Sequence, residues 1–563
     1  MRFEPVVGSL SDPLRRRALV CSAAAVLAVL AQSACGSSSS TTNVTPTCTV
    51  TGVTVSANPT TMNTGATSTL TATLNASSSC TGSVTWSATP SAGTLTANGL
   101  SATFTTTAAG TYTISATSTN DPTKSGTIAV TVTATTASTC GQPNGTVTVH
   151  SSNVTANETW AGDGVTHRVP NGFTISGNAI LTIQPCAIVA LGQGATINVG
   201  GTSHLVAAGT SSTRFVTFKR DVATQAWGTI RGVSETSLID LNWTFLNGGG
   251  NFGGMGDPTI AAFGSGYFVA PTPVIHVNNV TIQGSQGVGV YLDANAAFTG
   301  DSQLLQITGS GGRPVNTTMM SLGSLPTGSY VGNATDEILI FGPNANVFAD
   351  MTVQDLGVPV RIAYGAMSIA PAGGATAPVT LTLKPGVIFK FPRIGQSGPG
   401  ARVAFGTNGN PPNNLVGVLN AVGTAAKPIV FTSGETTPAP GDWVGLWLNT
   451  ANGSRLDYVE ISYAGAASSI VSANCRLINT PDNAALLIGD FSTQYVPPSN
   501  LITNSRITNS AGYGINAMWQ ASAFNSPDLT ATNTFQGNAR CRQTYNGLTP
   551  PGVCPVGGGC TAP

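Results

Sequence analysis

Short runs of alternating apolar and polar residues, roughly four to six residues long, recur along most of this chain. Leu181-Thr182-Ile183 and Val216-Thr217-Phe218 are examples in which every second side chain is apolar. A period of two places alternate side chains on opposite faces of a β-strand, and Gly, Asn or Pro separates the runs as turns would. Beyond the N-terminal segment, no long stretch carries apolar residues at the helical spacing i, i+3, i+4 and i+7. The pattern therefore predicts an all-β protein.

Many of these runs occur twice, in the same order, about two hundred residues apart. Residues 181–186 (Leu-Thr-Ile-Gln-Pro-Cys) return as residues 381–386 (Leu-Thr-Leu-Lys-Pro-Gly), and Trp227-Gly228 returns as Trp443-Val444-Gly445. Further matches in order are Asp240 with Asp457 and Asn279 with Asn504. Ordered repetition of strand-like runs is typical of stacked repeats, in which each inward side chain packs on its equivalent one coil away.

Residues 504–515 (Asn-Ser-Arg-Ile-Thr-Asn-Ser-Ala-Gly-Tyr-Gly-Ile) resemble one rung of a right-handed parallel β-helix. Both copies together resemble the pectin-lyase-like β-helix repeats of exported bacterial proteins. This resemblance implies a duplicated parallel β-helix over residues 140–547, with related copies at about 158–300 and 350–525. It implies no single activity, because that fold hosts lyases, hydrolases, adhesins and inert stalks.

A smaller β-domain is predicted before the β-helix, over residues 48–133. Turn residues punctuate its strand-like runs at intervals of about eight to twelve residues, which is the rhythm of a β-sandwich. Val84-Thr85-Trp86-Ser87 resembles the strand of bacterial Ig-like domains that carries the core tryptophan, and residues 109–114 resemble their penultimate strand. The resemblance implies a spacing or adhesive role.

The N-terminal residues have the organisation of an export signal. Arg15-Arg16-Arg17 precedes an apolar run at residues 18–31 that is too short to span a bilayer permanently. The small residues before Cys35 resemble a bacterial lipobox, although Gln32 stands where that pattern usually has an aliphatic residue. We therefore expect a lipoprotein signal at residues 1–34, lipidation of Cys35, and a flexible Ser/Thr tether at residues 35–47. The alternative is an ordinary cleaved signal in which this cysteine is incidental.

Composition restricts the partners. Charged residues are 8% of the chain, against about a quarter in ordinary soluble domains, and the net charge is zero. Without a basic field the chain is not expected to bind nucleic acid. The expected partners are the membrane, through the lipid, and an extracellular polysaccharide or protein. No cofactor motif is present.

The eight cysteines beyond Cys35 suit disulfides in an oxidising compartment. Cys48 and Cys80 fall within one small domain and are expected to pair. Cys541 is expected to pair with Cys554 or Cys560 and to fasten the Gly/Pro-rich tail at residues 548–563. A metal site is the rival interpretation of this C-terminal trio, but no nearby histidine or Cys-x-x-Cys spacing favours it.

Catalytic residues are not predicted. Asp240 and Asp457 are the repeated acids, and their equivalence favours a structural role such as accepting backbone N–H bonds at a turn. The alternative is a polysaccharide lyase or glycoside hydrolase, which needs acids that converge in one groove. Asp442 with Asp457 and Glu460, or Asp221 with Asp240, are the candidate clusters for that alternative. The glycine-rich segment 253–257 (Gly-Gly-Met-Gly-Asp) is expected to be a loop and not a calcium site.

Aromatic residues provide the candidate ligand contacts. Exposed aromatic rows on a β-helix can stack on sugar rings, because their faces are flat and apolar. The alternative is that a recurring tryptophan packs into the same corner of both copies. The candidates are Trp227, Trp443, Trp447, Trp519 and Tyr513. Segments in which the copies differ, residues 252–269 and 395–414, are the other expected location for a site. The chain is therefore predicted to be an exported, lipid-anchored protein of the outer membrane or cell surface, acting non-enzymatically in display, adhesion or ligand binding.

Overall fold

The computed structural model describes residues 47–133, 139–342, 345–363, 366–372, 375–393, 402–405, 416–448, 453–467, 483–489, 497–517 and 527–544. The chain divides between Thr136 and Ala137 into two compact units. Cys35, Trp519, Cys554, Cys560 and most of residues 395–414 lie outside the described residues. The expected signal peptide, nearly all of the tether, and the tail lie outside them as well.

The first unit is a β-sandwich of two four-stranded sheets. One sheet has the order β1-β3-β6-β5 and is antiparallel throughout. The other has the order β2-β8-β7-β4, in which only the β2–β8 pair is parallel. The strands are β1 (Val50–Asn58), β2 (Thr61–Asn63), β3 (Thr67–Ala76), β4 (Val84–Thr89), β5 (Thr94–Asn98), β6 (Ser101–Thr105), β7 (Gly110–Ser118) and β8 (Ser125–Thr133).

Alternation creates the core of this sandwich. Leu70, Phe104 and Ile114 are fully buried, while their sequence neighbours in the strands face outward. Trp86 lies in β4 as expected, and its indole Nε1 donates a hydrogen bond to the Gly99 carbonyl at 3.1 Å. The sandwich architecture predicted for residues 48–133 is therefore the one observed.

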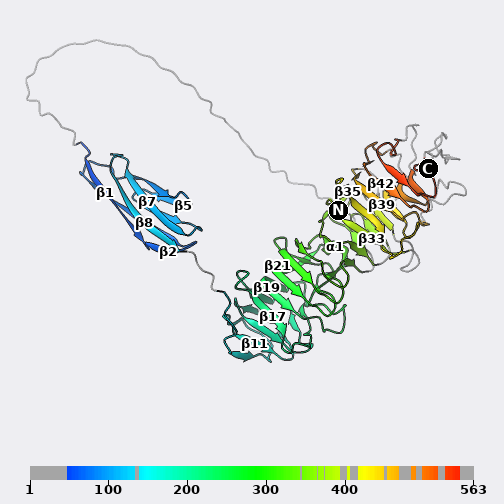
Figure 1. The fold of residues 1–563 in the computed structure, drawn as a ribbon, viewed down its shortest axis with the longest axis horizontal. Helices are drawn as coiled ribbons and strands as arrows, with labels where there is room; N and C mark the ends of the chain where they lie inside the picture. The colour runs from blue at the N-terminus through cyan, green and yellow to red at the C-terminus, as the bar shows by residue number, and fades with distance from the viewer. Residues whose placement is uncertain are drawn as a thin grey trace, which may run out of the picture. The chain divides into compact units, whose positions relative to one another are not determined.

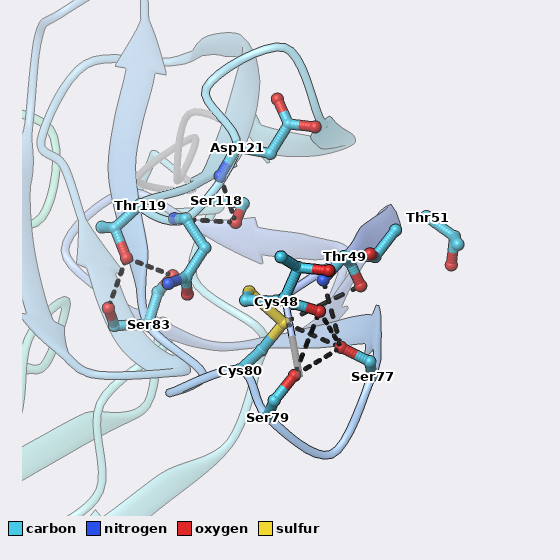
Figure 2. Close-up of a disulfide and its surroundings, with 12 residues drawn as sticks. Cys48, Thr49, Thr51, Ser77, Ser79, Cys80, Ser83, Ser118, Thr119 and Asp121 are labelled. Carbon is cyan, nitrogen blue, oxygen red and sulfur yellow. Dashed lines mark hydrogen bonds between the residues drawn. A yellow bond between two sulfur atoms is a disulfide. The ribbon is translucent and has the colours of Figure 1, made fainter. Parts of the chain in front are cut away.

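The disulfide Cys48–Cys80 closes one end of the sandwich, which confirms the expected pairing. Figure 2 shows this disulfide beside Ser77, whose hydroxyl accepts a hydrogen bond from the Thr49 backbone N–H at 3.1 Å. The Ser77 and Ser79 hydroxyls lie 3.0 Å apart in the same turn. The first strand is thus fastened to the turn that follows β3 by both covalent and polar contacts.

The second unit is a right-handed parallel β-helix (Figure 1). Its longest sheet contains thirteen parallel strands. They are β12 (Phe173–Ile175), β15 (Ile197–Val199), β18 (Ile230–Gly232), β20 (Ile260–Phe263), β22 (Val290–Asp293), β25 (Val315–Thr317), β27 (Ile338–Ile340), β30 (Val360–Ile362), β33 (Ile388–Phe391), β36 (Ile429–Ser433), β39 (Val459–Ser462), β42 (Arg506–Thr508) and β44 (Thr534–Gln536).

A twelve-stranded sheet covers two further faces of the N-terminal coils, because the long strands β19 and β21 bend around a corner and belong to both faces. It comprises β9 (Val147–Val149), β10 (Glu158–Trp160), β11 (Thr166–Val169), β13 (Ile180–Ile183), β14 (Ile188–Leu191), β16 (His204–Ala208), β17 (Val216–Arg220), β19 (Leu238–Asn247), β21 (Thr272–Gln283), β23 (Ala296–Phe298), β24 (Gln303–Thr308) and β26 (Gly328–Ser329).

In the C-terminal coils, two shorter sheets accompany the thirteen-stranded sheet. One contains β28 (Ala345–Val347), β31 (Met367–Ile369), β34 (Arg402–Phe405), β37 (Gly445–Leu448), β40 (Ala484–Ile488) and β43 (Tyr513–Ala517). The other contains β29 (Met351–Val353), β32 (Val379–Leu383), β35 (Gly417–Val422), β38 (Arg455–Asp457) and β41 (Ile502–Thr503). One short helix, α1 (Met319–Leu322), lies between β25 and β26.

The two copies lie on different faces of the β-helix. Residues 181–183 lie in β13, which follows directly after β12 of the thirteen-stranded sheet. The matching residues 381–383 lie in β32, which directly precedes β33 of that same sheet. Corresponding strands therefore have the same order within each copy, but the second copy begins one face later around the coil.

The described helix is too short to cross a membrane: within the described ranges no helix combines the length and apolar character that a span needs. A second disulfide, Cys140–Cys186, joins the start of the β-helix unit to the turn before β14. The sequence left these two cysteines without assigned partners. Cys541 is also disulfide-bonded, and its partner lies outside the described residues.

Candidate functional site

An unusual corner separates the two faces of the twelve-stranded sheet. Trp243, Asn279 and Leu304 occupy this corner in consecutive coils, since Asn242 pairs with Asn278 and Asn278 pairs with Gln303. All three have positive φ angles, of 41°, 57° and 56°. Asparagine tolerates this left-handed conformation, whereas tryptophan and leucine adopt it only at an energetic cost. Two bulky apolar residues therefore occupy positions that suit asparagine, and Leu304 is 48% exposed.

These corner residues form one side of a groove with a volume of about 740 Å³, which lies within the range typical of ligand sites. Its floor is the outward row Phe245, Thr281, Gln306 and Ser329, which are paired on β19, β21, β24 and β26. Its full lining is Ser212, Phe215, Trp243, Thr244, Phe245, Asn279, Thr281, Leu304, Gln306, Gly328 and Ser329. This set contains four large apolar side chains, several hydroxyls and amides, and no charged residue.

The Cys140–Cys186 disulfide holds in place the wall of the groove that carries Ser212 and Phe215. The Cys186 backbone N–H donates to the Phe215 carbonyl at 3.1 Å, and the Cys140 N–H donates to the Thr213 carbonyl at 2.7 Å. Since Cys140 and Cys186 are bonded to each other, the loop between β16 and β17 has contacts on both sides of the disulfide. The groove is therefore preformed, which lowers the ordering cost of binding.

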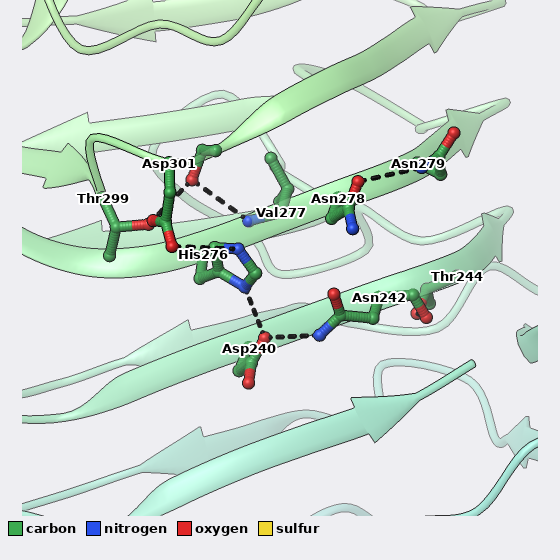
Figure 3. A network of polar contacts seen from close by, with 10 residues as sticks. Asp240, Asn242, Thr244, His276, Val277, Asn278, Asn279, Thr299 and Asp301 are labelled. Atoms are coloured by element: carbon green, nitrogen blue, oxygen red, sulfur yellow. Dashed lines mark hydrogen bonds and ion pairs between the residues drawn. The ribbon is translucent and has the colours of Figure 1, made fainter. Parts of the chain in front are cut away.

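Polar side chains on the parts of β19 and β21 that precede the corner form a hydrogen-bonded network (Figure 3). Asp240 Oδ1 lies 2.6 Å from His276 Nδ1 and accepts a hydrogen bond from Asn242 Nδ2 at 2.8 Å. On the next coil, Asp301 Oδ2 lies 3.9 Å from His276 Nε2. The imidazole thus lies between two carboxylates on the face adjoining the corner. Figure 3 also shows a separate hydrogen bond farther along β21, from Asn279 Nδ2 to Asn278 Oδ1 at 2.8 Å.

Trp227 and Trp443 do not serve as exposed stacking residues, so that expectation is wrong for them. Both indoles are fully buried. Trp227 Nε1 donates to the Asn247 carbonyl and Trp443 Nε1 donates to the Ser462 carbonyl, each at 2.8 Å. The two tryptophans pack into equivalent corners of the two copies, which was the alternative interpretation of their recurrence.

Trp447 and Tyr513 are also buried, in a second apolar cluster separate from the core of the β-helix. Trp447 points outward from β37 and packs with Leu487 and Tyr513. Trp447 Nε1 donates to the Gly489 carbonyl at 3.3 Å. Trp447 and Tyr513 are 5% and 7% exposed to solvent. Their rings are therefore covered by neighbouring residues and are not available to stack on a ligand.

The acids of the candidate catalytic clusters are paired with other groups. Asp442 Oδ1 lies 2.7 Å from Arg393 Nε, and its Oδ2 accepts a hydrogen bond from the Ser433 hydroxyl at 2.6 Å. Burial raises the pKa of Asp442, but the hydrogen bonds from Ser433 and Arg393 outweigh it and leave the pKa below its ordinary value. An acid that stays ionised in an ion pair is unsuited to donate a proton to a leaving group.

Asp457 joins two coils through its side chain. It accepts hydrogen bonds from the Thr503 hydroxyl at 2.8 Å and the Asn504 amide at 2.9 Å on the next coil, and no backbone N–H of the described residues donates to it. Burial raises the pKa of Asp457, and these bonds together with Arg455 bring it below its usual value. Its copy-one equivalent, Asp240, likewise bonds to a side chain one coil away.

The remaining candidate acids have basic partners. Asp221 lies 2.7 Å from Arg168, and Glu460 lies 3.4 Å from Arg506. Asp257 Oδ1 accepts the backbone N–H bonds of Gly253 and Gly254, so the glycine-rich segment is a self-closed loop as expected. Within the part of the chain that the structure describes, no group of three His, Cys, Asp or Glu side chains could hold a metal ion.

Two histidines at the N-terminal end of the β-helix form a pair, in which His167 is buried and His150 is partly buried. His150 Nε2 lies 2.9 Å from His167 Nδ1, and His167 Nε2 donates to the Ala161 carbonyl at 2.8 Å. The His150 ring stacks on Trp160 with centroids 3.8 Å apart. Burial lowers the pKa of each histidine, and Glu158, 3.7 Å from His150, opposes this only in part. Each imidazole is therefore held neutral.

We expect acidification to destabilise this N-terminal end. Because the folded pKa values lie below the unfolded value of about 6.5, the unfolded chain binds protons first as the pH falls. Stability should be constant above that pH, decrease below it, and level off below the folded pKa values. Hydrogen exchange of the β9 to β11 amides at pH 7.5 and pH 5 measures the effect. His150→Phe keeps a ring on Trp160 and should reduce the pH dependence; an unchanged profile in this variant would contradict the assignment.

Sequence reasoning missed the residues that line the groove. The alternation of apolar and polar residues does not single out Trp243, Phe215, Phe245 or Leu304. The alignment of the two copies does contain a signal for this corner. Asn279 aligns with Asn504, and the matching corner one coil earlier has Trp243 in one copy and Tyr458 in the other, so aromatic residues occupy a position that is asparagine on the next coil. The groove lies outside both segments in which the copies differ.

Comparison with known proteins identifies one part of the chain. No curated protein matches it. Residues 49–128, which span nearly all of the β-sandwich, match the family model of the bacterial Ig-like domain (group 2).

Proposed function

We propose that this chain is an exported surface protein whose β-helix binds a neutral extracellular polysaccharide without cleaving it. The observation that carries the proposal is the groove at the corner of β19, β21 and β24, where Trp243 and Leu304 occupy left-handed positions. Strained residues that persist at a surface groove are typical of functional sites, and here the backbone conformation alone would favour asparagine.

The lining of the groove suits sugars. Sugar rings present flat apolar faces, which stack on aromatic side chains, and hydroxyl edges, which bond to amides and alcohols. Phe215, Trp243 and Phe245 supply the first kind of contact, and Asn279 and Gln306 supply the second. The absence of charge from this lining favours a neutral polymer over a uronate or a charged peptide.

Binding without cleavage is tested by incubating the purified full chain with glucan, mannan and xylan oligosaccharides. We expect binding to at least one of them by isothermal calorimetry and no change in oligosaccharide length by chromatography. Release of shorter products would overturn the non-enzymatic part of the proposal. Failure to bind any neutral oligosaccharide would overturn the assignment of the ligand.

Export and anchoring are part of the same proposal. They are supported by the basic and apolar segments that precede Cys35 and by the Ser/Thr-rich segment after it. The Ig-like domain supports a surface location, because domains of this kind are common in surface or adhesion proteins. Resemblance of the repeats to pectin-lyase-like β-helices of exported proteins agrees with it. Palmitate labelling should be lost in Cys35→Ser, and labelling that persists would exclude this cysteine as the anchor.

A further inference from the structure

A second surface, on the thirteen-stranded sheet, has an arginine without a hydrogen-bond partner among the described residues. Arg231 points outward from β18, since its neighbours Ile230 and Gly232 are buried. Its guanidinium lies over two phenyl rings, 5.5 Å from the Phe252 centroid and 5.1 Å from the Phe263 centroid. Both phenylalanines belong to residues 252–269, one of the segments in which the two copies differ.

The other arginines of these coils show what Arg231 lacks. Arg220 donates hydrogen bonds to the carbonyls of Gly248, Ala223 and Gly284, and Arg168 pairs with Asp221. For Arg231, no oxygen among the described residues accepts a hydrogen bond, and its buried Nε is unpartnered. A guanidinium that packs on two rings, and whose terminal amino groups have no acceptor among the described residues, can bind a planar oxyanion through those amino groups.

The same outward row contains a second unpartnered group. Residues of the row are paired strand by strand, from Arg231 to Ala261, then to Tyr291, then to Asn316 on β25. Within the described ranges, no group donates a hydrogen bond to the buried Oδ1 of Asn316. At about 4.8 Å between neighbouring strands, the backbones of Arg231 and Asn316 are roughly 14 Å apart. The two residues thus lie at opposite ends of a row that crosses four strands.

Tyr291 lies between these two groups and is rigidly held. Its ring stacks on Phe341 with centroids 4.7 Å apart, and its hydroxyl donates to Asp293 Oδ2 at 3.2 Å. Tyr267, from the same inserted segment, donates to Asp293 Oδ1 at 2.5 Å. The hydrogen bond to Asp293 and partial burial raise the pKa of Tyr267 to about 12, so this hydroxyl remains a donor at neutral pH.

We propose that this row is a second binding site, for an acidic oligosaccharide whose carboxylate or sulfate group binds Arg231 and whose hydroxyl groups reach Asn316. The planar guanidinium can donate two parallel hydrogen bonds to an oxyanion, and the tyrosine lies between the two polar residues of the row. Because the row crosses four strands, it suits an extended ligand. The site is distinct from the groove, which belongs to the twelve-stranded sheet and has no charged residue. It does not depend on the proposed function.

Calorimetric titration of the full chain with a carboxylated oligosaccharide (hyaluronate), a sulfated one (chondroitin sulfate), a neutral glucan and sodium sulfate tests this site. We expect at least one acidic oligosaccharide to bind, and Arg231→Gln to weaken it at least tenfold. Arg231→Lys should show a smaller loss, since lysine keeps the charge without the planar fork. Lys384→Gln, an equal change of charge at an exposed position, should have no effect.

Three outcomes would overturn the proposal. These are equal affinity of Arg231→Gln and the unaltered chain, equal loss in Lys384→Gln, and full competition by sulfate alone at millimolar concentration. Asn316→Ala should also weaken binding, and it guards against a folding defect of the arginine variant because it lies three strands away. Trp243→Ala should leave acidic binding unchanged, so failure here and failure of the groove are distinguishable.

Discussion

Replacement of Trp443 by alanine is expected to lower the free energy of unfolding of the β-helix by about 3–5 kcal/mol. The indole is fully buried, stacks on Phe391 with centroids 4.4 Å apart, and donates to the Ser462 carbonyl. Alanine would leave a cavity the size of an indole and a buried carbonyl without its donor, and each of these changes is destabilising. Denaturant unfolding of the full chain, followed by tryptophan fluorescence and far-ultraviolet circular dichroism, measures the loss.

Trp227→Ala is the internal comparison, because Trp227 occupies the equivalent corner of the first copy and has the same kind of carbonyl partner. We expect a loss of stability of the same order in both variants, with oligosaccharide affinity unchanged wherever the chain remains folded. If either variant lost affinity while keeping its stability, the recurring tryptophans would have to be regarded as ligand contacts after all.

Strand positions follow from the sequence because burial in a β-helix acts on alternate residues. Leu381 and Leu383 point inward and Thr382 outward, as the pattern predicted. Cys48 and Cys80 could be paired because both fall in one small domain. In such cases the signal is local, and the tertiary structure reinforces it.

The face on which each copy begins could not be predicted from sequence. Each coil has three faces, and apolar and polar residues alternate in the same way on all of them. The sequence of a repeat therefore does not show on which face its strands lie. The shift depends on everything between the copies, including α1, which lies between β25 and β26. Four helical residues are too few for the period of 3.6 to be recognised.

The groove was also hidden, for a different reason. Tryptophan looks the same in sequence whether it packs inward, as Trp227 does, or lines a groove, as Trp243 does. The backbone conformation distinguishes them, because Trp243 has a positive φ angle and Trp227 does not. Tryptophan seldom adopts a positive φ angle, so its sequence position gives no sign of it. The repeat comparison drew attention to the buried residues Trp227 and Trp443, because a duplication preserves equivalent packing positions.

The left-handed corner residues lead to a prediction in which stability and binding change in opposite directions. Leu304→Asn should raise the free energy of unfolding by about 1 kcal/mol, because asparagine adopts a positive φ at lower cost and this leucine is 48% exposed. Trp243→Asn should change stability less, since the relief of strain is offset by lost packing. Both variants should weaken binding of the neutral oligosaccharide at least tenfold, because they remove the apolar surfaces of one wall.

Asn279 lies between these two residues in the same corner and supplies the reverse experiment. Asn279→Leu should lower stability by about 1 kcal/mol, since leucine would take on the strain that asparagine avoids. Thermal unfolding and calorimetric titration of all three variants give the two quantities independently. If Leu304→Asn lowered stability and left affinity intact, leucine would be at this corner for packing, and the argument for a binding groove would lose its main support. If stability rose and affinity fell together, the strain at this corner would be explained by the ligand that it serves.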